Sequence, residues 1–144
     1  MLKNIPPLLG PELLAILRAM GHGDEIAIVD ANYPAEAAGP ALVRLDGISA
    51  TDVLDAILTL MPLDDFVDEA ALTMQVVGDP DRREPIVEEF AAILRRHEPG
   101  MRLGSLERFA FYERVGKGYA VVQTGERRLY GNILLKKGVL RLGA

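Results

Sequence analysis

The spacing of apolar residues changes on either side of Gly21. Before it, apolar side chains recur every three or four positions, the period of one helical face, and Pro11 suits a first helical turn because its missing N–H would be unpaired there. After it, the run IAIV that follows Glu25 is unbroken, which is typical of a short strand covered on both faces. The pattern predicts a helix over Pro11–Met20, ended by Gly21, and then a buried strand at 25–29.

The same two patterns alternate through the rest of the chain. Further strands are predicted at 42–45, 72–77, 119–124 and 132–136. Further helices are predicted after a capping Ser49, from about Glu84 to His97, and from a capping Ser105 through Val115. Such alternation is typical of an α/β fold, in which right-handed crossovers place helices on both faces of the sheet. The prediction is a single three-layer domain over residues 1–144, with a largely parallel sheet flanked by helices.

Composition narrows the functional classes. The 144 residues are 49% apolar and 26% charged, with a formal net charge of -5, as in an ordinary soluble globular protein. Cysteine is absent, which excludes disulfides, a thiol nucleophile and a cysteine-ligated metal. The lack of a basic run argues against a nucleic-acid partner, and apolar runs such as that at 57–63 are too short to span a membrane. The N-terminal residues do not resemble a signal peptide, so a cytoplasmic location is expected.

His22, one of only two histidines, lies between Gly21 and Gly23. Imidazole titrates near neutral pH, so it can both give and take a proton. The flanking glycines remove side-chain bulk and would let a ligand approach closely. The alternative is a histidine that simply follows the end of a helix, where a cationic ring suits the helix dipole.

Asp30 closes the predicted strand at 25–29 and is followed by a turn-like AlaAsnTyrPro. Ligands of open α/β sheets bind beyond the carboxyl ends of the strands, so Asp30 is a candidate for binding hydroxyl groups or for orienting an imidazole. The alternative is a turn-forming aspartate whose side chain accepts from its own backbone.

Two further sites offer polar groups. With Ser105 as the cap, Arg108 falls in a first helical turn, where a cation opposes the helix dipole. A residue placed against this rule favours a site role. The alternative is an ion pair with Glu107 or another acid. TyrGlyAsn at 130–132 offers a phenol and an amide around a glycine, or else an ordinary turn. Whether Tyr33 or Tyr112 reaches a pocket stays open.

No motif in the chain predicts a cofactor. A phosphate-binding loop, a dinucleotide glycine fingerprint and a nucleophile elbow are all missing from the sequence. One histidine beside Asp24 and Glu25 is weak support for zinc, which usually takes several nitrogen or sulfur ligands. We therefore expect His22 to act without a nucleotide or a metal.

The stretches MGHGDEIAIVDANYPA at 20–35, ERFAFYER at 107–114 and TGERRLYGNILLKKGV at 124–139 resemble the L-fucose mutarotase / D-ribose pyranase family. The likeness covers nearly the whole chain, and GlyHisGlyAsp and TyrGlyAsn are more similar to the fucose branch. It implies an α/β fold in a ring-like assembly, often decameric, with sites where subunits meet. The family's functional residues fall on His22, Asp30, Arg108, Tyr130, Gly131 and Asn132.

The resemblance implies a sugar mutarotase that needs no cofactor. Opening a sugar ring requires a proton to leave the anomeric hydroxyl and another to reach the ring oxygen, and we expect His22 to serve as donor and acceptor. Asp30 would bind hydroxyls or hold the imidazole at the same pocket, while Arg108, Tyr130 and Asn132 would bind further hydroxyls. The alternatives are a D-ribose pyranase and a non-catalytic sugar-binding module. The expected partners are a monosaccharide and further copies of the chain.

Overall fold

The computed structural model describes residues 1–143 and confirms the predicted alternation of strands and helices. The strands are β1 (Glu25–Val29), β2 (Ala41–Leu45), β3 (Ala71–Met74), β4 (Leu103–Leu106), β5 (Ala120–Thr124) and β6 (Ile133–Lys136). The helices are α1 (Pro11–Ala19), α2 (Ala50–Leu60), α3 (Pro85–His97) and α4 (Arg108–Gly116), with a short 3-10 turn η1 (Glu36–Ala38). Over these residues no helix is long and apolar enough to cross a membrane.

Within the described residues, the strands form one six-stranded sheet in the order β2-β5-β1-β6-β3-β4. The pairs β2–β5, β5–β1 and β3–β4 are parallel, whereas β6 is antiparallel to both β1 and β3. All of these strands except β6 therefore point the same way, which confirms an α/β fold with a largely parallel sheet. One consequence decides the site: the residues after β1 and those before β6 meet at the same edge of the sheet.

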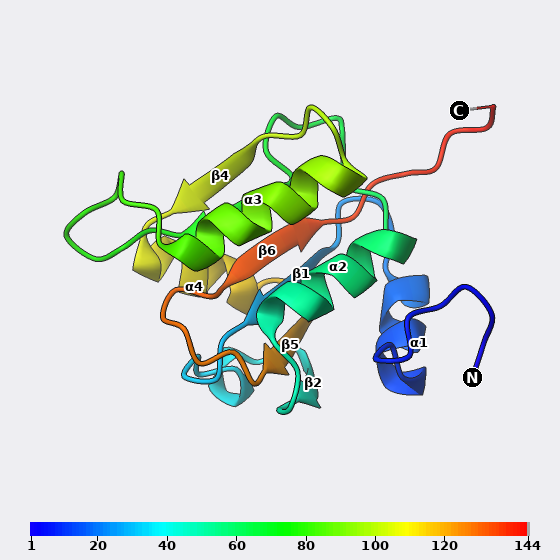
Figure 1. Ribbon diagram of the computed structural model, residues 1–144, viewed down its shortest axis with the longest axis horizontal. Helices are drawn as coiled ribbons and strands as arrows, with labels where there is room; N and C mark the ends of the chain where they lie inside the picture. The colour runs from blue at the N-terminus through cyan, green and yellow to red at the C-terminus, as the bar shows by residue number, and fades with distance from the viewer. Residues whose placement is uncertain (144) are drawn as a thin grey trace.

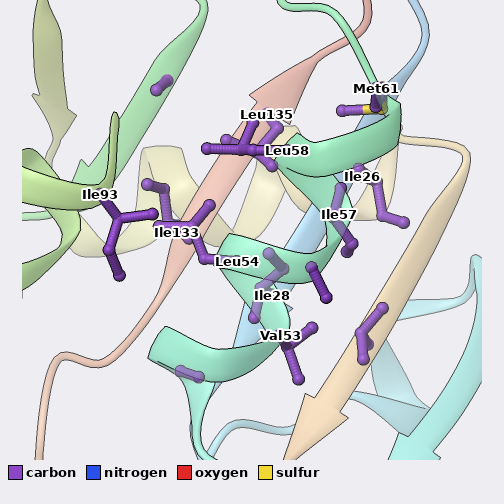
Figure 2. Close-up of a cluster of buried hydrophobic side chains, with 14 of the residues drawn as sticks. Ile26, Ile28, Val53, Leu54, Ile57, Leu58, Met61, Ile93, Ile133 and Leu135 are labelled. Atoms are coloured by element: carbon purple, nitrogen blue, oxygen red, sulfur yellow. The ribbon is translucent and has the colours of Figure 1, made fainter. Parts of the chain in front are cut away.

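Helices cover both faces of the sheet, with α2 and α3 in front and α4 behind in Figure 1. The side chains of β1 alternate between these layers: Ile26 and Ile28 enter the larger core with α1, α2 and α3, and Ala27 and Val29 enter the smaller core with α4. Figure 2 shows Ile26 and Ile28 beside the α2 residues that fill the larger core. Burial on both faces explains why the run at 25–29 is uniformly apolar.

The largest error of the sequence prediction lies between residues 103 and 110. Ser105 does not cap a helix; it belongs to β4, an edge strand that the pattern did not predict. The cap of α4 is Glu107, whose carboxylate accepts hydrogen bonds from the backbone N–H groups of Phe109 and Ala110 at 2.9 and 3.1 Å. A glutamate can replace serine here because a carboxylate at a helix N-terminus both accepts these hydrogen bonds and complements the dipole.

Candidate active site

A cleft of about 200 Å³ opens at the edge of the sheet where the parallel strands end. It is lined by Asp30, Asn32, Tyr33, Met74, Val77, Arg108, Tyr112, Leu129, Tyr130 and Asn132. The structure thus brings together four of the residues singled out from the sequence, which come from three separate stretches of the chain. Carboxylate, guanidinium, phenol and amide groups facing one small cleft suit a ligand rich in hydroxyl groups.

Asp30 and Asn132 form the floor of this cleft. The backbone N–H of Asp30 donates to Oδ1 of Asn132 at 2.8 Å, and the N–H of Asn32 donates to Oδ1 of Asp30 at 3.0 Å. Asp30 is only 4% exposed, and burial raises its pKa above the ordinary value, because the hydrogen bonds from its neighbours do not fully offset the loss of hydration. The turn-forming role and a place in the cleft therefore occur together in this aspartate.

The loop before β6 places Tyr130 and buries Gly131. Tyr130 adopts a left-handed backbone conformation with φ 63°, and its hydroxyl accepts a hydrogen bond from the N–H of Val77 at 3.1 Å. A Cβ at Gly131 would lie 2.9 Å from Cγ of Glu126 and 2.9 Å from Cδ1 of Ile86. A side chain at position 131 would force these neighbours to shift, so the chain's own packing favours a glycine here, independently of any approach by a ligand.

Arg108 is the first residue of α4 and lies beside the cleft. Its place in the first helical turn was predicted correctly, although the cap is Glu107 rather than Ser105. The guanidinium lies 4.5 Å from the centre of the Phe109 ring. Its Nε is buried and has no hydrogen-bond partner within residues 1–143, so this donor lacks the acceptor that buried donors usually have.

Tyr33 and Tyr112 both line the cleft, which settles a question that the sequence left open. Their rings pack edge to face with centres 5.2 Å apart. Tyr33 is only 5% exposed, and its hydroxyl has no hydrogen-bond partner among the described residues. Burial is the main reason that the pKa of this phenol is raised, and the nearby Tyr112 and Asp30 raise it further. The phenol therefore stays protonated.

Replacing Tyr33 with phenylalanine is expected to stabilise the ligand-free protein by about 1 kcal/mol, since a buried hydroxyl without a partner costs about 1 to 3 kcal/mol. Urea unfolding at neutral pH measures this gain as a higher midpoint with an unchanged slope. The matched control is Tyr119→Phe, because Tyr119 is 39% exposed and its hydroxyl can reach water. Equal or lower stability of Tyr33→Phe would mean that the hydroxyl is satisfied in solution.

His22 lies at the opposite edge of the sheet, in the turn between α1 and β1. Its Nε2 is 3.0 Å from Oδ1 of Asp64, and its ring centre is 5.2 Å from that of Phe66. The imidazole is 44% exposed while the Asp64 carboxylate is 5% exposed. An accessible imidazole held by a buried carboxylate is an arrangement that can pass protons to and from a bound ligand.

The expectation that β1 places His22 and Asp30 at the same pocket is wrong for a single chain. His22 precedes the amino end of β1 and Asp30 follows its carboxyl end, and His22 is not among the residues that line the cleft. At the rise of an extended strand, the five residues of β1 alone separate its two ends by about 13 Å. Both residues flank β1, as their positions in the sequence indicate, but the two ends of one strand lie at opposite edges of the sheet.

Asp64 is the residue that the sequence analysis missed. It follows the apolar run at 57–63, which begins in α2 and continues past its end. Its Oδ1 also accepts a hydrogen bond from the N–H of Phe66 at 3.0 Å. Burial on its own raises the pKa of Asp64, but the hydrogen bonds from Phe66 and His22 outweigh it and hold the pKa below the ordinary value. Asp64 is thus an ionised partner for the imidazole. Over residues 1–143 no three histidine or acidic side chains are grouped so that they could hold a metal ion.

Known proteins resemble this chain over nearly its full length. It is 48% identical over 147 residues to the fucose mutarotase of Homo sapiens, which covers 98% of this chain and 96% of the human protein. Its fold matches the crystal structure of the fucose mutarotase in complex with L-fucose from Streptococcus pneumoniae with a TM-score of 0.89 and 44% identity, over 97% of this chain and 100% of that one. Bacillus subtilis RbsD complexed with D-ribose matches with a TM-score of 0.72 and 23% identity over 98% of this chain and 100% of that one, a likeness that shows the fold alone. The chain belongs to the RbsD / FucU transport protein family, whose model it matches over residues 3–140.

Proposed function

We propose that the protein is a sugar mutarotase, an isomerase that interconverts the α and β anomers of L-fucose or a related monosaccharide. The observation that carries the proposal is the small polar cleft of Asp30, Arg108, Tyr130 and Asn132, together with an exposed imidazole that a buried carboxylate holds. The human relative, a fucose mutarotase, and the L-fucose complex of the streptococcal one support the choice of sugar.

Anomer exchange needs only proton transfer. A proton leaves the anomeric hydroxyl while another reaches the ring oxygen, the ring opens, and it closes again on the other face of the carbonyl. We assign the transfers to His22, whose imidazolium the ionised Asp64 stabilises. Asp30, Arg108, Tyr130 and Asn132 would hold the remaining hydroxyls so that the reacting carbon stays fixed during ring opening.

The proposal requires a second copy of the chain, because His22 and the cleft lie at opposite edges of one sheet. A head-to-tail contact would bring the His22 of one subunit to the cleft of the next, and repetition of such a contact forms a ring when its rotation closes. A homo-oligomer, with a decamer as the family resemblance implies, is therefore part of the proposed function. The expected cytoplasmic location also belongs to this proposal.

Mixed oligomers test whether the site is shared between copies. His22→Ala and Asp30→Ala should each exchange anomers much more slowly than the unaltered protein, because every site lacks one group. When the two variants are mixed as unfolded chains and refolded together, about a quarter of the sites should receive His22 from one subunit and Asp30 from the other. Activity of the mixture near that fraction supports a shared site, whereas a mixture as inactive as the single variants contradicts it.

Saturation-transfer NMR tests the activity itself. With a catalytic amount of protein, irradiation of one anomer of L-fucose should reduce the signal of the other beyond the uncatalysed exchange. D-ribose in a parallel sample distinguishes the pyranase, which would exchange the pyranose and furanose signals instead. Saturable binding of either sugar without faster exchange would identify a non-catalytic binding module.

A further inference from the structure

The segment after β6 lies between the two halves of the His22–Asp64 pair. In Figure 1 it converges with the turn between α1 and β1 and with the loop after α2, beyond the arrowhead of β6. On one side, the carbonyl of Lys136 accepts from the N–H of Asp64 at 3.0 Å. On the other, the carbonyl of Lys137 accepts from the N–H of Gly23 at 2.9 Å, and the N–H of Lys137 donates to the carbonyl of Asp24 at 2.9 Å. One short segment thus binds the backbone of Asp64 and the backbone of the two residues that follow His22.

The Lys137 side chain adds a second attachment. Its ammonium donates to the carbonyl oxygens of Leu17 and Met20 at 2.6 and 2.5 Å, at the end of α1 where helix carbonyls lack partners within the helix. A cation there also complements the helix dipole. Burial lowers the pKa of this lysine, as expected for an ammonium that has exchanged water for protein carbonyls.

The turn that carries His22 is closed by two hydrogen bonds of its own: the N–H of Gly21 donates to Oδ2 of Asp24 at 2.7 Å, and the N–H of Asp24 donates to the carbonyl of Gly21 at 3.1 Å. Glycines flank the histidine, and Gly23 adopts the left-handed conformation with φ 88°. Lys137 fixes both ends of this turn: its ammonium holds Met20 at the start, and its backbone holds Gly23 and Asp24 at the finish. A turn that bears a proton-transfer group is placed more accurately when its two ends are tied to the segment that also binds the backbone of the partner Asp64.

We propose that Lys137 is a positioning residue, which holds the His22 turn so that the imidazole stays within hydrogen-bond distance of Asp64. The inference rests on the proposed function, because it assigns Lys137 to the proton-transfer group of that site. It predicts an effect on turnover and not on sugar binding, since the groups assigned to bind the sugar hydroxyls are those of the cleft, none of which Lys137 holds.

The test replaces Lys137 with methionine, which keeps the length of the side chain and removes its donors. We expect the kcat for L-fucose anomer exchange to fall about 10-fold to 100-fold with an unchanged KM, since an error of about 1 Å in a catalytic group costs up to about 10²-fold. Relative to the unaltered protein, amide hydrogen exchange should become faster in residues 20–24 and stay the same in the rest of the chain. Lys137→Arg, which retains a cation with several donors, should recover much of the loss.

The control is Lys117→Met, which removes an exposed lysine whose ammonium pairs with Glu113, one turn earlier on α4. A full kcat in Lys137→Met overturns the proposal, as does a loss of kcat without faster exchange in residues 20–24. If Lys137→Met has a lower kcat, a changed KM and a lower thermal stability, and Lys137→Arg recovers none of them, Lys137 is a purely structural residue and the proposal is overturned. If the unaltered protein exchanges no anomers, the proposed function fails instead, and the hydrogen-exchange result still reports whether Lys137 holds the turn.

Discussion

Replacing His22 with alanine is expected to lower the rate of L-fucose anomer exchange by about 10² to 10⁴-fold, the usual contribution of a general acid–base group. The variant should still bind L-fucose, because the polar groups of the cleft come from Asp30, Arg108, Tyr130 and Asn132. The loss should appear in kcat, since the imidazole acts on protons that move in the transition state. Saturation-transfer NMR measures the exchange, and titration calorimetry measures the binding.

His97 provides the matched control for this substitution. It is the second histidine of the chain, and its Nε2 lies 2.6 Å from Oδ1 of Asp55, so it too is paired with a carboxylate. It ends α3 and lines no part of the cleft. We expect His97→Ala to retain the full exchange rate. Undiminished exchange in His22→Ala would refute the assignment of proton transfer to His22.

Part of the cleft could be predicted from the sequence, because a general rule of sheets applies to Asp30, which follows a buried strand. Asn132 precedes another strand, but it was selected for its amide beside a glycine and was grouped with Asp30 by the family resemblance. They meet since β6 runs antiparallel to β1, which brings the start of one to the end of the other. Arg108 joins them through its place at the start of α4, a local feature that needed no knowledge of the tertiary fold.

The His22 half of the site could not be predicted in the same way. Its partner Asp64 is 42 residues away, and only the strand pairing between β1 and β6 brings the two segments together through Lys136 and Lys137. No local pattern marks Asp64, which follows an apolar run and precedes another aspartate. The sequence around β4 misled for a related reason: Ser105 has the character of a helix cap, and only pairing with β3 makes it part of a strand.

Replacing Asp64 with asparagine is expected to lower the exchange rate by about 10²-fold. Asparagine has the size of aspartate and can still accept from the N–H of Phe66, so the loop should keep its form. It cannot stabilise the imidazolium that forms when His22 takes a proton, nor does it select one ring tautomer by its charge. KM should change little. A full rate in Asp64→Asn would mean that the pair at 3.0 Å plays no part in proton transfer.

The same substitution changes how stability depends on pH. The pKa of Asp64 lies below its ordinary value of 3.8, so the ionised carboxylate stabilises the fold above that value. This contribution is lost as the pH falls through the lower pKa of the folded state. At pH 7 the free energy of unfolding of the unaltered protein should exceed that of Asp64→Asn by about 1 kcal/mol, a modest value because water screens the half-exposed His22.

Urea unfolding of both proteins between pH 7 and pH 3 measures this difference. The contributions of the other acidic groups cancel in it, since both proteins contain those groups. A difference that shrinks only below about pH 4 supports an ionised Asp64 in the folded protein, whereas one that is the same at every pH would show that the carboxylate is not held in its charged form.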